Sequence, residues 1–291
     1  MAFSGFDDII TEAGNGKKQR ITGNRIINTG ATTAAGRWHE CFAISNGMGG
    51  IGVLNGTAGV GAPRDATSPG ALPVNPVNVT PDTRHLMAGA AVVYSALAVP
   101  GVAKFIDILY VYPSCVISTG AGTVLSNAAG KPARFNNGKD VKLGAIVVGA
   151  LGAASPVITC TYVDQDGNTG NTGFLAAAAN SLPVGCLLTG AAVAALGGPE
   201  MIMATGDSGV RELTSYTTAS GTTGTITFFL YRDLGDVPLL QATLMSERDF
   251  LTQIPSLPQI DDSPCLTALV LSGGALTANN IISLTMQLQW G

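Results

Sequence analysis

The stretch of residues 206–231, GDSGVRELTSYTTASGTTGTITFFLY, indicates the architecture of this chain. Two runs within it, residues 212–217 and 225–231, are rich in β-branched and aromatic side chains, which favour strands. Residues 220–224 form a short connection of Gly and Thr between them. Two such runs separated by a short Gly-containing turn predict a β-hairpin.

Residues 281–291, IISLTMQLQWG, alternate between apolar and polar side chains. Successive side chains of a strand point to opposite faces, so a period of two indicates a strand with one apolar face. We expect this strand to lie in a sheet with its apolar face against the core. The apolar positions are Ile282, Leu284, Met286, Leu288 and Trp290, and the polar ones are Ser283, Thr285, Gln287 and Gln289.

Further strands are expected along the chain, each apolar or rich in β-branched and aromatic residues. Residues 86–99 are apolar and Ala-rich, and they favour either a strand or a short helix. Short helices are expected at residues 6–13 and 246–254, the latter with Ser246 as its N-cap. The remaining expected strands are residues 37–45, 103–117, 141–151, 156–163 and 265–271.

The fold class follows from many short strands, Gly-rich turns and little helix. The sequence predicts an all-β fold: an antiparallel β-sandwich, jelly-roll-like, with an extended irregular N-terminal arm and few short helices. The arm is expected over residues 1–84 with one or two short elements, and the sandwich domain over residues 85–291. Residues 14–36 are polar, and residues 46–84 are rich in Gly and Pro with no sustained period. So long an irregular segment is unusual in a compact domain, and we expect it to reach across neighbouring subunits.

Charged residues make up only 12% of the chain, about half the usual share, while hydrophobic residues make up 46%. A surface so poor in charge suggests that much of it faces other protein. The net charge of −4 argues against general nucleic-acid binding, which needs a basic face. The basic cluster of Lys17, Lys18, Arg20 and Arg25 is interpreted as a solvated segment, with docking onto an acidic partner surface as the alternative.

The five cysteines are far apart, odd in number and without a CxxC pair. With no secretory signal, this pattern favours free buried thiols made in a reducing cytoplasm. No run of 18 uninterrupted apolar residues occurs, so we expect no membrane span. The cysteines are Cys41, Cys115, Cys160, Cys186 and Cys265.

The GDSG sequence around Ser208 matches the start of the nucleophile motif of chymotrypsin-like proteases. His39 and Asp107 precede it in the order of that family's triad. However, Val210 and Arg211 follow where the family has Gly-Pro, and the residues before His39 depart from the family's pattern. Asp-Ser-Gly is also a common turn sequence. We therefore expect a turn before a strand, and no catalytic residue.

Two groups have partial metal-ligand spacing. Asp164, Asp166 and Asn168 match the first three ligands of a calcium loop, but Leu175 stands where a bidentate Glu is needed. A hairpin turn is the preferred interpretation. His39 and Cys41 share a face of a strand, but a closed zinc site needs four ligands and no second pair is present. We predict no metal site and no cofactor.

Three arginines stand at the ends of expected elements: Arg211, Arg232 and Arg248. They are interpreted as ordinary surface or interface pairing, with ligand binding as the alternative. No phosphate-binding loop and no paired carboxylates in an apolar setting are found.

Several stretches resemble a family of tailed-bacteriophage virion proteins, most of them uncharacterised structural proteins. The resemblance covers most of the chain beyond about residue 25. It brings no catalytic residues with it, so the chain is not expected to be an enzyme. The stretches are TPDTRHLMAG at 80–89, DILYVYPSC at 107–115, GDSGVRELTSYTT and TGTITFFLYRDL within 206–234, SERDFLTQIPSLPQIDDSPCL at 246–266, and the final QLQWG.

The resemblance implies a particle component assembled in the cytoplasm of a bacterial host. We expect a capsid-associated cement or decoration protein, or a minor capsid protein, that binds the major capsid protein and forms homo-oligomers, with a trimer favoured. The alternatives are a tail, collar or fibre component, or a carbohydrate-binding surface module. No membrane and no specific nucleic acid are expected as partners.

Overall fold

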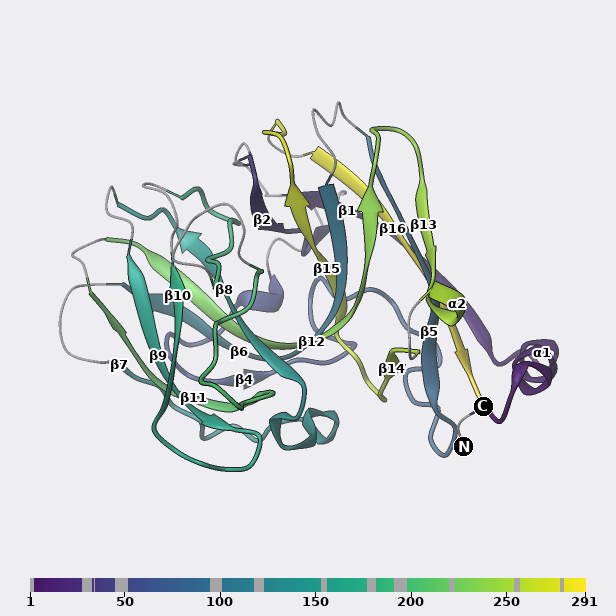
Figure 1. Ribbon diagram of the computed structural model, residues 1–291, viewed down its shortest axis with the longest axis horizontal. Helices are drawn as coiled ribbons and strands as arrows, with labels where there is room; N and C mark the ends of the chain where they lie inside the picture. Colours follow the sequence, from purple (N-terminus) through teal and green to yellow (C-terminus); the bar gives the residue numbers. More distant parts are fainter. Residues whose placement is uncertain are drawn as a thin grey trace.

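The computed structural model is an antiparallel β-sandwich with few short helices, which confirms the predicted fold class (Figure 1). In the part of the chain that the structure describes, the strands form three sheets, which we call the central, terminal and threonine sheets. The structure describes residues 3–27, 33, 35–44, 52–94, 101–117, 123–152, 156–176, 182–190, 198–219, 223–253, 257–277 and 280–291.

The central sheet is organised by two long strands, β6 and β12, which pair antiparallel over almost their whole length. The short strand β4 adds to β6 outside the main order. In order across the sheet, the strands are β2 (Arg37–Glu40), β15 (Leu266–Ser272), β6 (Gly101–Val116), β12 (Thr225–Leu239) and β8 (Val141–Gly149), with β4 at Ala62–Pro63.

The terminal sheet contains the strand nearest the C-terminus, and the threonine sheet contains the strands on either side of residues 164–171. In order, the terminal sheet is β13 (Ser246–Asp249), β5 (Arg84–Val93), β16 (Asn280–Trp290), β1 (Lys18–Ile27) and β3 (Ala43–Ile44), with β14 (Gln259–Ile260) on β5. The threonine sheet is β10 (Asn171–Ala176), β9 (Val157–Asp164), β11 (Val210–Thr218) and β7 (Thr123–Val124).

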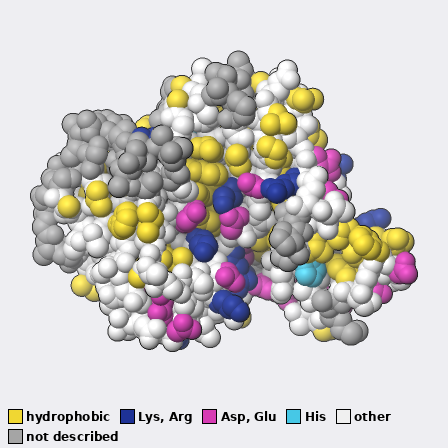
Figure 2. Space-filling model, viewed as in Figure 1, with side chains coloured by type: hydrophobic (Ala, Val, Ile, Leu, Met, Phe, Trp, Pro, Cys, Tyr) yellow, Lys and Arg dark blue, Asp and Glu magenta, His cyan; other side chains and the backbone are white. Residues whose placement is uncertain are grey.

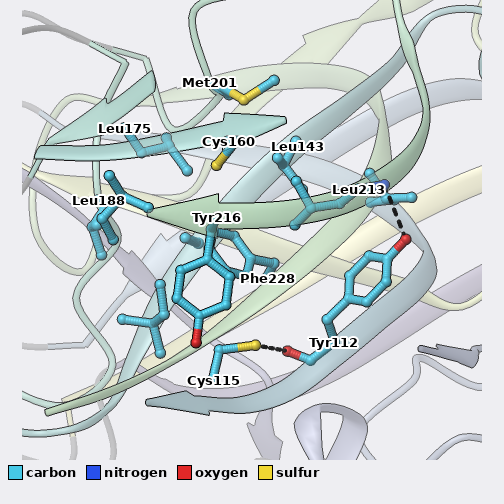
Figure 3. Close-up of a cluster of buried hydrophobic side chains, with 14 of the residues drawn as sticks. Tyr112, Cys115, Leu143, Cys160, Leu175, Leu188, Met201, Leu213, Tyr216 and Phe228 are labelled. Atoms are coloured by element: carbon cyan, nitrogen blue, oxygen red, sulfur yellow. Dashed lines mark hydrogen bonds between the residues drawn. The ribbon is translucent and has the colours of Figure 1, made fainter. Parts of the chain in front are cut away.

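The two long strands of the central sheet run through two hydrophobic cores. Phe105 of β6 packs in one core with Leu284 of the terminal sheet. Further along the strand, Tyr112 packs in the other core with Tyr216 of the threonine sheet. Figure 3 shows this second core, in which the Tyr112 hydroxyl accepts a hydrogen bond from the Leu213 amide at 3.1 Å. The molecule is thus two sandwiches that share one sheet.

A third buried cluster occupies the opposite face of the central sheet, with Ile106, Ile108 and Phe229 against Trp38 and Phe42. Strands buried on both faces read as continuous apolar runs without alternation. This explains why FIDILYVY at 105–112 is a strong strand signal in the sequence and still carries no period of two.

The predicted hairpin is wrong. Residues 210–218 form β11 of the threonine sheet, whereas residues 225–239 form β12 of the central sheet. The two runs meet as opposite walls of a core, where the rings of Tyr216 and Phe228 lie 5.2 Å apart. Each run is apolar on one face, and these faces are buried against each other instead of pairing edge to edge.

The predicted strand at the end of the chain is confirmed. It forms β16 and lies in the middle of the terminal sheet, between β5 and β1. Ile282, Leu284, Met286 and Leu288 point into the core, as the alternation predicts. At the end of the strand, the Arg84 guanidinium lies 5.6 Å from the centre of the Trp290 ring.

The predicted arm differs from the structure in its first part. A short helix, α1 (Phe6–Gly14), occurs where it was predicted, but Lys18–Ile27 forms β1 and pairs with β16 along its whole length. The polar composition of β1 hid this strand, because its outward side chains are exposed and Gly23 and Arg25 occupy inward positions. Residues 52–83 have the expected irregular structure, broken by the 3₁₀ turn η1 (Gly52–Leu54) and by β4.

The helix expected at residues 246–254 is half strand and half helix over its described residues, 246–253. Residues 246–249 form β13 at the edge of the terminal sheet, and only Phe250–Gln253 form a helix, α2. Asp249, not Ser246, is the cap: its carboxylate accepts hydrogen bonds from the Leu251 amide at 2.8 Å and the Thr252 hydroxyl at 2.7 Å. A 3₁₀ segment, η2 (Ala133–Gly138), precedes β8. No helix in the described part of the chain combines the length and apolarity needed to cross a membrane.

Candidate functional sites: a charged cleft and two sheet faces

A cleft of about 890 Å³ opens where the two sandwiches meet on the central sheet. Figure 2 shows Lys, Arg, Asp and Glu side chains gathered in the middle of the molecule. The position follows from β6 and β12, whose polar residues Asp107 and Arg232 interrupt their apolar runs between the two cores. The charged lining residues are Asp65, Arg134, Lys139, Asp140, Arg232, Asp233, Asp261 and Asp262.

The base of the cleft is a buried ion pair between Arg134 of η2 and Asp107 of β6, with Nε 3.0 Å from Oδ2. The second oxygen of Asp107 accepts the Cys265 amide at 2.7 Å, and Arg134 donates to the carbonyls of Arg64 and Ile108. Burial raises the pKa of Asp107, while Arg134 and the Cys265 amide oppose that shift. The pair therefore joins β6, η2 and the segment just before β15.

The other charges of the cleft are mostly satisfied within the chain. Arg232 is paired with Asp261, and Asp233 with Lys104. Asp262 accepts the Val79 amide at 2.7 Å and the Thr80 hydroxyl. A site that binds a charged ligand leaves charges unpaired for it, whereas these groups already have partners within the chain.

The three residues of the protease-like order are not assembled. His39 lies on β2 opposite Val270, which is opposite Ala103 of β6. Asp107 is four residues further along β6, roughly 13 Å away at about 3.3 Å per residue. The carboxylate of Asp107 is held by the buried ion pair, and Ser208 is exposed in the loop before β11. The turn interpretation of GDSG is confirmed.

The glycines of GDSG have a structural reason. Gly206 has a φ of 100°, a conformation that favours glycine. A Cβ on Gly209 would overlap the carbonyl oxygen of Gly138, because the two backbones touch there. The amides of Ser208 and Gly209 both donate to the Gln165 side chain at 3.1 Å, which fixes the loop against the β9–β10 turn.

The calcium-like spacing is also a turn, as predicted. Asp164 accepts the amides of Asp166 and Asn168 at 2.9 Å and the side-chain amides of Asn168 and Asn171 at 2.8 and 3.2 Å. Burial opposes the charge of Asp164, but these hydrogen bonds outweigh it and lower its pKa. Both carboxylate oxygens are thus occupied by the hairpin itself. Within the described residues, no group of three or more His, Cys, Asp or Glu side chains could hold a metal ion.

The five cysteines are buried and unpaired, which confirms that part of the prediction. Burial raises the pKa of Cys115 and of Cys186 to about 12. A thiol needs a lowered pKa to act as a nucleophile near neutral pH, so these two serve as small core residues.

The predicted basic cluster is divided among three environments. Lys17 pairs with Glu12 at 3.0 Å and Asp82 at 2.8 Å. Arg25 is buried and donates to the carbonyl of Gly70 at 3.2 Å. Lys18 and Arg20 remain exposed on β1, pointing away from the core.

Two of the three singled-out arginines make surface ion pairs, as predicted: Arg232 with Asp261 and Arg248 with Asp236. Arg211 is exposed on β11. Sequence reasoning found these residues but not the partners, which lie far away in the chain or across a turn.

The outer face of the threonine sheet is the first of two sheet faces that sequence reasoning did not single out. Ile158, Cys160 and Tyr162 of β9 point into the core, so Thr159 and Thr161 point outward. The strand register places uncharged side chains beside them in two rows. One row is Thr172, Thr161, Ser215 and Val124, and the other is Phe174, Thr159 and Thr217.

This threonine face is open to solvent. Val124 is 81% exposed and Val157 39% exposed, and Thr159, Thr172 and Thr217 are exposed beside them. The sequence does carry the signal, because VITCTYV at 157–163 alternates Thr with core residues. What the sequence could not give is the register that aligns three strands into one uncharged surface.

The second sheet face that the sequence did not indicate is the outer face of the terminal sheet. Small side chains dominate its middle, with Ala88 and Ala90 on β5 and Ser283 and Thr285 on β16. The polar side of the predicted amphipathic strand therefore lies here, and the side chains of Ala88, Ala90, Ser283 and Thr285 are all buried within the chain.

Neither a family model nor a curated protein matches the chain. Among solved structures, the structure of the infectious bursal disease virus Gx strain aligns with this chain. The alignment covers 94% of this chain and 80% of that chain, with 9% identity and a TM-score of 0.20. The VP2 subviral particle of that virus aligns over the same shares with 8% identity and a TM-score of 0.20. Its T=1 particles align with 94% and 77% coverage, 10% identity and a TM-score of 0.20. Likenesses at such TM-scores carry no argument about this chain.

Proposed function

We propose that this protein is a structural component of a bacteriophage virion, a capsid-associated cement or decoration protein or a minor capsid protein. It stabilises the shell through contacts with the major capsid protein, and no step in this role needs a catalytic residue or a cofactor. The resemblance of the sequence to tailed-phage virion proteins supports a role as a virion component. The scarcity of charge supports a surface that other proteins cover.

The observation that carries the proposal is the outer face of the threonine sheet. Hydroxyl and methyl groups of Thr159, Thr161, Thr172 and Thr217 lie on this face in two rows. Burial of the methyl groups is favourable and the hydroxyls can hydrogen-bond to a partner, which offsets their desolvation, whereas a buried unpaired charge costs about several kcal/mol. A surface of this kind suits permanent contact with another protein.

The test is incorporation into particles. Purified virions of the phage that encodes this chain should contain it in a fixed ratio to the major capsid protein, measured by quantitative mass spectrometry. Thr159→Lys places a charge in the middle of the threonine face and should reduce incorporation at least tenfold. Ser208→Lys, on an exposed loop outside that face, is the matched control and should incorporate normally. Absence of the wild-type chain from particles would refute the proposal.

The favoured homotrimer is part of the same proposal, because capsid shells offer three-fold positions. Electron microscopy of the labelled virion separates the alternatives. Label on the shell supports the capsid role, label on the tail, collar or fibres supports a tail component, and binding to glycan arrays without incorporation supports a carbohydrate-binding module.

A further inference from the structure

Helix α1 carries apolar side chains on its outer side. Phe6 and Ile10 are 65% and 70% exposed, and Figure 2 shows hydrophobic side chains gathered at this end of the molecule. Residues four apart lie on the same face of a helix, with Cβ atoms about 5–6 Å apart. The other side of α1 rests on the terminal sheet, where the Ile9 carbonyl accepts a hydrogen bond from the Gln289 side chain. No residue of α1 is buried, so the single chain leaves this apolar pair without a partner.

A groove of about 540 Å³ lies on the central sheet, between its strand ends and the segment that follows η1. The exposed residues Asn55, Ala58, Ser114 and Val116 leave it open to solvent, and Val116 is 60% exposed. None of the side chains that line the groove carries a charge. They are Leu54, Asn55, Ala58, Ser114, Val116, Val148, Gly149, Thr225 and Thr227.

A β-bulge shapes one wall of the groove. Ile226 pairs with Cys115 and Phe228 with Tyr112, so two residues of β6, Pro113 and Ser114, stand opposite the single residue Thr227. Ser114 has a φ of 50°, and its amide donates to the Thr227 hydroxyl at 3.2 Å. A bulge bends its strand and redirects side chains, and it is often found at functional positions of a sheet. The groove therefore lies beside a local distortion that specific contacts hold in place.

The groove and α1 lie at opposite ends of the molecule. The Tyr216 hydroxyl donates to the Val116 carbonyl at 2.8 Å, and Tyr216 pairs with Thr123 of β7. This places the groove at the β7 end of the long axis, whereas α1 lies at the other end (Figure 1). The helix therefore cannot reach the groove of its own chain, but it can reach the groove of a second copy.

Size and charge both suit this occupant. A cavity of about 150 Å³ holds a benzene ring, so the side chains of Phe6 and Ile10 together need roughly 300 Å³, less than the groove provides. Asp7 is exposed beside them on α1. Next to the groove, the half-buried Arg64 donates to the carbonyls of Val53 and Asn55. Within the described residues Arg64 makes no ion pair, so its charge complements that of Asp7.

We propose that α1 of one copy binds in this groove of a second copy, with Phe6 and Ile10 inside it and Asp7 beside Arg64. A helix that anchors residues i and i+4 in an apolar groove is a recurring mode of protein recognition. The contact joins two different surfaces, so it is heterologous, and repetition about a rotation axis closes it into a ring such as a trimer. It also gives the N-terminal segment the role of reaching a neighbouring subunit.

The contact is tested by sedimentation velocity over a range of protein concentrations. Phe6→Ala/Ile10→Ala removes the anchors but keeps residues that favour a helix, and it should weaken self-association at least tenfold. Val116→Lys places a charge in the uncharged groove and should weaken it as strongly. The matched control is Val124→Lys, at a valine of β7 that is 81% exposed and lies outside the groove. This control should associate like the wild type.

A mixture of variants tests whether the two surfaces bind each other. The Phe6→Ala/Ile10→Ala chain keeps its groove, and the Val116→Lys chain keeps its helix. Each should be monomeric alone, and the two should form a one-to-one dimer when mixed, because one helix and one groove remain intact.

A mixture that stays monomeric would overturn the proposal, as would a wild-type chain that is monomeric at every concentration. If that monomer required Val116 for incorporation into particles, the groove would belong to another virion protein. The proposed contact does not depend on the virion role, because an oligomer that never joins a particle would leave it standing.

Discussion

The charged cleft and the threonine face make opposite use of side-chain chemistry. The cleft concentrates charges from a chain with only 15 Lys and Arg and 19 Asp and Glu, and half of its charged lining residues are held in ion pairs within the chain. The threonine face, on the outside, has hydroxyl and methyl groups in its two rows. Charge in this molecule therefore gathers in the cleft, while the exposed threonine face remains suited to contact with other protein.

The largest effect should come from breaking the buried ion pair of the cleft. Arg134→Met leaves Asp107 buried without its partner and should lower the free energy of unfolding by about 3–5 kcal/mol at pH 7, measured by urea denaturation. Because burial already raises the pKa of Asp107, the carboxyl should protonate more readily in this variant. The loss should therefore be smaller at pH 5. A loss of the same size at both pH values would contradict this account.

A second prediction separates backbone from side chain in the GDSG loop. Gly209→Ala forces a Cβ against the Gly138 carbonyl and should cost about 1–3 kcal/mol of stability. Ser208→Ala, at the exposed neighbouring position, is the control and should change stability by no more than about 0.5 kcal/mol. Thermal unfolding of both variants checks the pair. If Ser208→Ala were the more damaging change, the structural role given to this loop would be wrong.

Lowering the pH should destabilise the protein through an acidic residue of the cleft, Asp262, whereas the two rows of the threonine face contain no group that titrates. Burial opposes the charge of Asp262, but hydrogen bonds from Thr80 and Val79 outweigh it and lower its pKa. A lowered pKa contributes stability that is present above the ordinary value near 3.9 and is lost as the pH falls through the folded value. Stability should thus decline below about pH 4. In Asp262→Asn, the urea midpoint should fall less between pH 7 and pH 3 than it does in the wild type. An equal fall in both proteins would contradict the role given to Asp262.

The smallest effect on stability should come from the threonine face. Thr159→Lys places a charge on an exposed strand position and should change the free energy of unfolding by no more than about 0.5 kcal/mol. Thermal unfolding of the isolated protein provides the measurement. The same variant should thus keep its stability and still lose incorporation into particles, which would assign the loss to the threonine face. If Thr159→Lys unfolded the isolated protein, the incorporation test would say nothing about the face itself.

Local sequence signals predicted the strands well but not the partners of those strands. The alternation in 282–290 identified β16, and the apolar run in 105–112 identified β6. Residues 212–217 and 225–231 were placed in one hairpin, because only a tertiary contact such as that between Tyr216 and Phe228 reveals that they lie in different sheets. β1 was missed, because its outward row of Lys, Arg, Thr and Asn reads as a loop until β16 pairs with it.

The candidate sites depended on such long-range partners even more strongly. Sequence reasoning noted Arg20 and Arg25 as one cluster, yet one is exposed and the other is buried against Gly70. The ion pair of Asp107 and Arg134 joins residues from separate elements, and neither residue has a local pattern that announces it. Aligned rows on a sheet face depend on register, which composition does not encode.

The pairing of β1 with β16 also imposes a delay during biosynthesis, because β1 is made long before its partner strand. Lys18 pairs with Gln289, so the ribosome adds most of the chain between the two strands. At about 5–20 residues per second, the wait is on the order of 10–50 s. During that interval β1 has no permanent hydrogen-bonding neighbour on that edge, and chaperones or a premature partner strand have their best opportunity to capture it.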